Sequence, residues 1–251
     1  MKKRKIYLAS FFVALFLLVL TGCSQKSQEI PTKKVTVSLS NTKTIPTFFF
    51  HGWGSSVNAE KHMANAAKKA GATNTIVQAD VSKNGTVKLS GTIPKSAKNP
   101  IIEVNLEDNQ SGKTSYVKDV ITAVSNKYHY AKINLVGHYD GYLGEEAGQK
   151  AKIKNKETGQ PDIYSDGFKK LLPLRKHYPK QIEVLNIYGN KKDGSNSDGS
   201  VSVASAQSYK YLINGRAKSY REVEMKGKNA QHSKLHENKE VDRLLIDFLW
   251  K

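Results

Sequence analysis

Short apolar runs alternate with stretches of helical periodicity along most of this chain, and this alternation restricts its possible folds more than any other feature. Several runs are almost continuously apolar, which is typical of strands that are covered on both faces. We expect strands at residues 34–39, 47–50, 74–78, 85–90, 101–104, 133–136 and 183–188, and helices at residues 59–70, 115–128, 166–177 and 241–250. The pattern predicts an α/β domain with a mostly parallel sheet and helices on both faces.

The N-terminus has the parts of a lipoprotein signal peptide. Four cations follow Met1, an apolar run extends from Ile6 to Leu20, and the sequence Thr21-Gly22-Cys23 comes next. The run is shorter than the roughly 20 residues of a membrane-spanning helix. We therefore expect cleavage before Cys23, lipid on its sulfur, and an exported protein held at the outer face of the cell membrane. An ordinary signal peptide and an uncleaved anchor helix are the alternatives.

This interpretation divides the chain into a signal peptide at residues 1–22, a lipidated tether and leading segment at residues 23–44, and one α/β domain at residues 45–251. Cys23 is the only cysteine, so no disulfide can form within the chain. Residues 1–22 hold four of the 40 lysine and arginine residues and none of the 22 acidic ones, which leaves a net charge of +14 on the remainder.

The basic charge is compatible with two roles, attraction to anionic polymers or lipid head groups and simple solubility at a surface. The lysines are spread along the chain, and no zinc-finger, RNP-like or heptad pattern accompanies them. Nucleic acid is therefore not an expected partner.

Two expected strands end in glycine turns that suit acyl-transfer chemistry. Residues 48–54 read Phe-Phe-Phe-His-Gly-Trp-Gly, and the turn at Gly52 and Trp53 can present backbone N–H groups to an oxyanion, although a plain strand-to-helix turn reads the same way. Residues 133–138, Ile-Asn-Leu-Val-Gly-His, begin like the strand before a nucleophile elbow, G-x-S-x-G. Tyr139 stands at the serine position, and Asp140 falls one position too late to replace it.

The segment at residues 141–162 is glycine- and lysine-rich without apolar periodicity, so we expect an exposed loop where an elbow requires a helix. A second loop, at residues 193–199, follows the strand at 183–188 and contains two aspartates. Its spacing does not fit an EF-hand, because Gly194 and Ser205 would fall at the first and last ligand positions. A carboxylate that orients a histidine is the alternative.

Two histidines, His232 and His236, lie just before the last expected helix. A histidine after the acidic loop and near the C-terminus fits the chain order nucleophile, acid, base. The pair together with Glu237 also suggests a metal site, but a third ligand is not apparent, so we expect neither a metal nor another cofactor. Surface histidines are the remaining interpretation.

These motifs together resemble the cell-surface α/β-hydrolases of Gram-positive bacteria, a family largely without assigned function. The resemblance extends from about Ile45 to Trp250, and its most distinctive parts are residues 195–199, Ser-Asn-Ser-Asp-Gly, and residues 230–238, Ala-Gln-His-Ser-Lys-Leu-His-Glu-Asn. It implies that Asp198 is the triad acid, that His232 is the general base, and that the Gly52–Trp53 turn forms part of the oxyanion hole.

The chain departs from this family after Gly137-His138. The family pattern is Gly-His-Ser-Met-Gly, then a helix and a strand that ends in a second Gly-His before a Tyr-Asp-Gly-like loop. Here the first Gly-His runs directly into Tyr139-Asp140-Gly141. An in-frame deletion between the two Gly-His sites explains this, and it predicts a fold that lacks the serine, one helix and one strand after the fifth core strand.

Loss of the serine in a triad enzyme costs on the order of 10⁶ in turnover, so the resemblance predicts a catalytically impaired hydrolase. Ser55 and Ser56 lie near the oxyanion turn and are the candidate replacements in an ester or acyl hydrolase that remains active. The alternatives are a non-catalytic lipoprotein that binds an anionic or acyl cell-envelope ligand, with Tyr139 in the pocket, and a defective product of a decayed gene.

Overall fold

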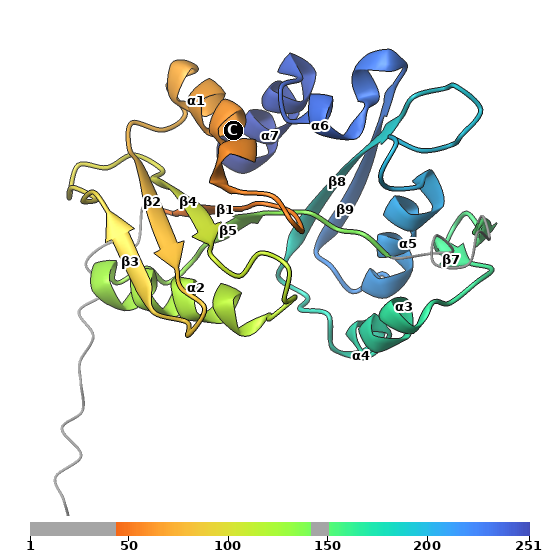
Figure 1. Cartoon of the computed structure of the whole chain (residues 1–251), viewed down its shortest axis with the longest axis horizontal. Coiled ribbons are helices and arrows are strands. Elements are labelled where there is room, and N and C mark those ends of the chain that lie inside the picture. Colours follow the sequence, from red (N-terminus) through yellow and green to blue (C-terminus); the bar gives the residue numbers. More distant parts are fainter. Residues whose placement is uncertain (1–43, 142–150) are drawn as a thin grey trace, which may run out of the picture. The chain divides into compact units, whose positions relative to one another are not determined.

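A five-stranded sheet with the strand order β3-β2-β4-β1-β5 forms one half of the fold (Figure 1). The structure, a computed structural model, describes residues 44–141 and 151–251. The expected signal peptide, Cys23 and the strand at residues 34–39 lie outside the described residues. The five strands are Thr47–Phe50 (β1), Ile76–Val81 (β2), Val87–Ser90 (β3), Ile101–Leu106 (β4) and Asn134–Val136 (β5). Neighbours are parallel except β3, which runs antiparallel to β2.

Helices pack against both faces of this sheet, and successive side chains of a strand point to opposite faces. Phe48 packs with Val120 and Val124 of helix α2 (Ser115–Tyr128) in one apolar cluster. Phe49 packs in a second cluster with residues of α1 (Lys61–Lys69) and α7 (Lys239–Trp250). This arrangement explains the continuous apolar run of β1 and confirms the predicted mostly parallel sheet with helices on both faces.

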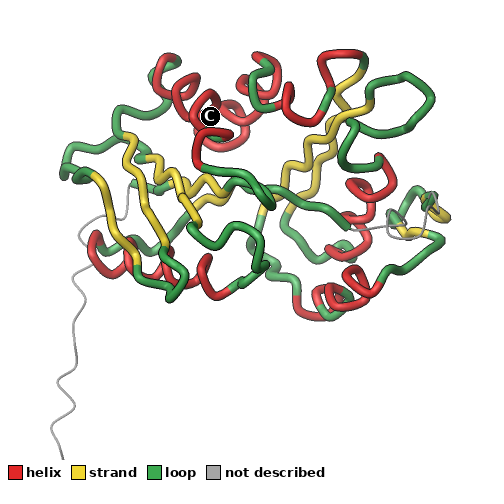
Figure 2. The backbone as a smooth tube through the Cα atoms, viewed as in Figure 1, coloured by secondary structure: helices red, strands yellow, loops and turns green. Residues whose placement is uncertain are grey.

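A separate parallel pair, β8 (Glu183–Asn190) and β9 (Ser219–Lys226), forms a second sheet (Figure 2). Among the described residues, no strand is hydrogen-bonded between β5 and β8. The two sheets instead share the second apolar cluster, in which Ile101 of β4 and Met225 of β9 meet Leu244 of α7. Side-chain packing joins the two sheets where a continuous sheet would use backbone hydrogen bonds.

Short helices and a hairpin occupy the remaining chain. They are the 3₁₀ turns η1 (Val57–Ala59) and η2 (Lys228–Ala230), the helices α3 (Asp166–Leu171), α4 (Leu174–His177), α5 (Val203–Ile213) and α6 (His232–Leu235), and the antiparallel strands β6 (Ile153–Asn155) and β7 (Gln160–Pro161). In Figure 1, α1, α6 and α7 lie on one side of the sheets and α2 on the other. In the described ranges no helix is both long and apolar enough to cross a membrane.

Several expected elements need correction. The single helix expected at residues 166–177 is two helices, because Pro173 has no N–H to continue the helical hydrogen bonds. The loop expected at residues 141–162 contains the β6–β7 hairpin in its described part. The structure also adds α5 and β9, which the sequence patterns did not predict.

Candidate functional site

Asp198 and His232 meet at one end of the β8–β9 pair. Asp198 lies in the loop after β8, and His232 is the first residue of α6. The His232 Nδ1 donates to Asp198 Oδ2 at 2.8 Å, and the His232 backbone N–H donates to the Asp198 carbonyl oxygen at 2.9 Å. The structure therefore brings together the two residues that the sequence suggested as acid and base.

The surroundings of Asp198 keep its carboxylate ionised. Burial alone would raise the pKa of Asp198, but hydrogen bonds from His232, Val201 N and Ser200 N outweigh burial and hold this pKa below its usual range. The hydrogen bond to Asp198 in turn raises the pKa of His232, against the opposite effect of burial. An ionised Asp198 accepts from Nδ1, so the neutral His232 ring carries its lone pair on Nε2.

Gly189, near the end of β8, allows the Asp198 loop and the segment before His232 to approach each other. A Cβ at Gly189 would lie 2.1 Å from the Ala230 carbonyl oxygen and 2.8 Å from the Asp198 Cβ. No side chain fits at these distances. The absence of a side chain at this position is therefore a condition for the acid–base geometry.

The second loop aspartate, Asp193, has a different environment. Its Oδ2 forms an ion pair with Lys191 Nζ at 3.0 Å, and its Oδ1 accepts hydrogen bonds from the backbone N–H and the hydroxyl of Ser195. Asp198 faces His232 instead. The two loop carboxylates thus serve different partners, which agrees with the poor fit of this loop to a calcium site.

The turn after β1 is held by His51, whose side chain is buried. The Leu106 backbone N–H donates to His51 Nε2 at 3.1 Å, which ties the ends of β1 and β4 together. Within the described ranges, the backbone N–H groups of Gly52 and Trp53 donate no hydrogen bond inside the protein. Both groups are able to donate to a bound anion, and Trp53 beside them is 65% exposed. The oxyanion role stays a prediction.

The segment after β5 does not form a nucleophile elbow. Among described residues the non-glycine positive φ angles occur at Asn99, His129, Lys192, Asn196 and Asn214, none of them in residues 137–141. The strained turn that exposes a nucleophile is therefore missing in the described chain.

Tyr139 does not lie in the pocket, which corrects the expectation for this residue. Its hydroxyl is hydrogen-bonded to Ser208 Oγ at 2.8 Å, and its ring lies 4.7 Å from the ring of Tyr209. Burial raises its pKa above the usual range. The side chain belongs to the apolar cluster of α3 and α5, because a tyrosine that follows a strand without an elbow helix is free to pack against α5.

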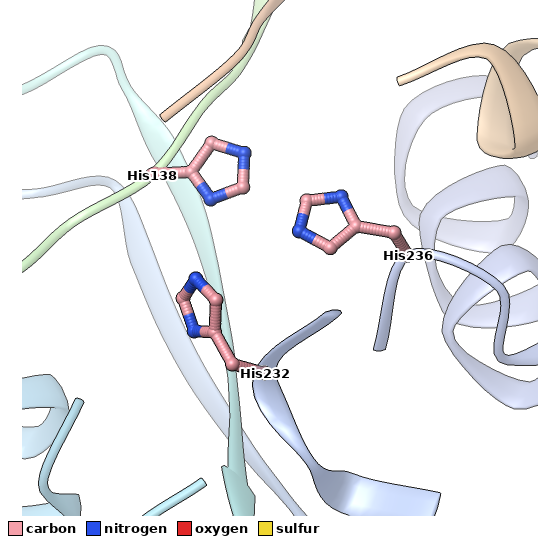
Figure 3. Close-up of side chains that lie close together, drawn as sticks. All are labelled: His138, His232 and His236. Carbon is pink, nitrogen blue, oxygen red and sulfur yellow. The ribbon is translucent and has the colours of Figure 1, made fainter. Parts of the chain in front are cut away.

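His138, and not Tyr139, is the residue after β5 that lies beside the Gly52 turn and His232. A Cβ at Gly52 would lie 3.4 Å from His138 Cγ, so His138 contacts the oxyanion turn. The His138 ring also lies 6.4 Å from the His232 ring and 4.9 Å from the His236 ring (Figure 3). His138, His232 and His236 each offer one ligand atom, and these atoms lie within 4.8 Å of one another. Glu237 is not part of this group.

Glu60, at the start of α1, supports this histidine group from below the surface. It is fully buried, and its Oε1 accepts from His138 Nε2 at 2.9 Å and lies 3.8 Å from His236 Nδ1. Burial lowers the pKa of His236, and the neighbouring histidines act in the same direction. No sequence pattern pointed to Glu60, because it is separated from His138 by 78 positions and precedes an Ala- and Lys-rich helix without a motif.

Neither Ser55 nor Ser56 replaces the missing serine in this geometry. No hydrogen bond in the described chain joins either hydroxyl to His232. The Ser55 carbonyl oxygen accepts from Asn109, and Ser56 precedes η1. The acid–base pair therefore has no hydroxyl partner on Nε2 among the residues described.

Comparison with known proteins agrees with this architecture. The profile of the family described as alpha/beta hydrolase of unknown function (DUF915) matches residues 34–145 and 139–251. A solved protein from Listeria innocua superposes with a TM-score of 0.72 at 20% identity, over 83% of this chain and 94% of its own. A protein described as a candidate cell surface hydrolase of Lactobacillus plantarum gives 0.64 at 22% identity, over 83% and 92%. No curated protein matches the chain. The two family matches span most of the chain and the solved structures share its fold, so this protein belongs to that family of α/β hydrolases of unknown function.

Proposed function

We propose that this chain is an exported, lipid-anchored member of its α/β-hydrolase family in which serine-dependent ester hydrolysis has been lost. One observation carries the proposal. The Asp198–His232 pair is intact, but the free Nε2 of His232 faces His138 and His236 and has no hydroxyl partner in the described chain (Figure 3). An acid and a base without a nucleophile cannot form an acyl-enzyme.

The loss is best explained by deletion of the elbow serine, its helix and the following strand. Two features support this explanation. The five-stranded sheet ends at β5 and the next parallel strand, β8, lies in another sheet. The family profile matches in two segments whose boundary falls at residues 139–145, where the deletion is inferred.

Leu135 of β5 adds a third supporting feature. It is paired in register with Phe48, so its side chain lies on the α2 face of the sheet, and 53% of it is exposed. A helix after β5 in an intact elbow packs over such a residue. A deleted helix accounts for this exposed leucine on an otherwise buried sheet.

A fluorophosphonate probe on the full-length chain in detergent tests the loss of the serine. We expect no labelling under conditions in which an added serine esterase is fully labelled, and no turnover of a short-chain ester. Labelling that disappears in the His232→Gln variant would show that another serine serves as nucleophile. The variants Ser55→Ala and Ser56→Ala would then identify it.

The Tyr139→Ser variant tests whether the elbow survives. We expect it to remain inactive, because residue 139 points toward Ser208 and away from His232. We also expect it to be less stable by about 2 kcal/mol, since a partly buried aromatic ring is removed. Ester hydrolysis by this variant would contradict the deletion.

Lipid anchoring rests on the signal sequence before Cys23, and the description of the Lactobacillus plantarum relative as a cell surface protein supports an exported location. Metabolic labelling with an alkyne fatty acid in a Gram-positive host is the direct test. We expect labelled protein in the membrane fraction, and neither label nor membrane retention for Cys23→Ala. An unlabelled wild-type chain would refute the anchor.

A second candidate function is non-catalytic binding of an anionic or acyl ligand of the cell envelope. It is favoured by the two N–H groups at Gly52 and Trp53 without a partner in the described chain, beside an exposed indole, in a chain whose residues 23–251 carry a net charge of +14. Thermal-shift measurements with anionic cell-wall polymers and with acyl compounds test it, and no stabilisation by either class counts against it. The absence of any cooperative unfolding transition would favour a defective gene product instead.

A further inference from the structure

The three clustered histidines come from two distant parts of the chain. His138 follows β5, whereas His232 and His236 lie at either end of the short helix α6. Figure 3 shows one ring nitrogen of each histidine turned toward the space between the three rings. From the sequence, only His232 and His236 were expected to lie together. His138 joins them because β5 pairs with β1 and ends beside the Gly52 turn.

The hydrogen bonds on the outer nitrogens determine where each neutral ring carries its lone pair. His138 Nε2 donates to Glu60, His232 Nδ1 donates to Asp198, and His236 Nδ1 donates to the Ala59 carbonyl oxygen at 3.2 Å. Carboxylate and carbonyl oxygens only accept, so these three nitrogens carry the hydrogens. The lone pairs are left on His138 Nδ1, His232 Nε2 and His236 Nε2, the nitrogens that face inward.

This is the arrangement of an imidazole metal site, in which each ligating ring donates its other N–H to a carboxylate or carbonyl. We propose that His138, His232 and His236 bind one divalent transition-metal ion of the zinc type at the position of the lost serine. The inference rests on the proposed loss of serine hydrolysis, because a serine hydroxyl would otherwise occupy His232 Nε2.

The distances require only a small closure of the rings. Nitrogens bound to one tetrahedral zinc ion at about 2.0–2.1 Å lie about 3.3 Å apart, compared with the 4.8 Å limit of the present group. Each ring moves by less than about 1 Å to reach that geometry. Three protein ligands leave a fourth coordination position. The His138 side chain is 30% exposed, so solvent reaches the group from this side.

Glu60 provides an independent reason to expect a cation here. It is fully buried, and its Oε2 has no hydrogen-bond partner among residues 44–141 and 151–251. A buried carboxylate without a nearby positive charge is strongly disfavoured. A divalent ion bound by His138 and His236 would place a double positive charge on the far side of the imidazole rings that contact this carboxylate.

Zinc binding to the full-length chain, purified without a histidine tag, is the test. Isothermal titration with Zn²⁺ should give one site per chain, and Co²⁺ should give the visible absorption of a four-coordinate centre. We expect His138→Gln and His236→Gln each to weaken Zn²⁺ affinity by about 100-fold or more. Far-UV circular dichroism and metal-free melting temperature show whether each variant is folded.

His129→Gln and His177→Gln are the matched controls, because both histidines lie outside the group. They should bind Zn²⁺ as the wild type does. Absence of a single-site isotherm in the wild type, wild-type affinity in His138→Gln or His236→Gln, or equal weakening in the controls would each overturn the proposal. Fluorophosphonate labelling of the wild type would instead contradict the proposed function, so the two failures are distinguishable.

Discussion

Glu103 is a buried carboxylate in the middle of β4 that has no hydrogen bond from any described residue. Burial raises its pKa, Lys61 opposes this effect, and Glu60 adds to it. When the pKa of a carboxyl group is higher in the folded than in the unfolded state, the group does not destabilise the protein below its unfolded pKa. The free energy of unfolding then falls as the pH rises through the folded pKa.

We therefore expect Glu103→Gln to be more stable than the wild type at pH 7, with a difference that shrinks as the pH falls toward 4. Melting temperatures of the two proteins across this pH range provide the measurement. A glutamine variant that is less stable at pH 7 would mean that the ionised Glu103 has a favourable partner.

Position 189 has no room for a side chain, because the Ala230 carbonyl oxygen lies 2.1 Å from where a Cβ would stand. Gly189→Ala should lower the free energy of unfolding by about 3 kcal/mol or more, since the Ala230 carbonyl must shift. Gly137→Ala is the control, because its nearest contact, Phe50 Cβ at 3.7 Å, is an ordinary one. Denaturant unfolding compares the two variants. Equal free energies of unfolding would show that the segments around Asp198 and Ala230 can shift away from residue 189 without loss of stability.

At the scale of elements, the exposed Leu135 of β5 and the fully buried Leu212 of α5 form a matched pair. Leu212→Ala should cost about 2–5 kcal/mol, the range for a buried leucine. Leu135→Ala should cost less than about 1 kcal/mol, because no described helix covers it. Urea unfolding measures both, and a large loss for Leu135→Ala would mean that a segment outside the described residues covers β5.

The predicted elements were right where most of the buried side chains are apolar. The strands at residues 47–50 and 101–104 were found because their side chains enter apolar clusters on both faces. Helix α5 was missed because two of its buried residues are Ser205 and Ser208, which bind the 139–141 segment. Strand β9 was missed because charged residues alternate along it.

The site was predictable only in part for a similar reason. The chain order of acid and base is visible in the sequence, and Asp198 and His232 meet as it suggests. The direction of a side chain after β5, the last strand of the described five-stranded sheet, is not visible in the sequence. His138 therefore turns toward the site and Tyr139 away from it, contrary to the elbow-based expectation.

At the scale of the whole described domain, the two sheets depend on a shared apolar cluster for their connection. Helix α7 contributes Val241 and Leu244 to this cluster, together with residues from β1, β4 and β9. The family fold thus persists without a continuous sheet, because helices on one face cover both parts.

The open boundary between the sheets has a consequence for behaviour at high concentration. In the described chain, β5 and β8 each pair along one side only, which leaves a row of N–H and C=O groups able to template pairing with another copy. A lipid anchor would concentrate such copies in the plane of a membrane. We expect reversible self-association that grows with concentration in sedimentation velocity and is reduced by Leu135→Lys on β5, because β5 would then pair less well with a strand of a neighbouring copy.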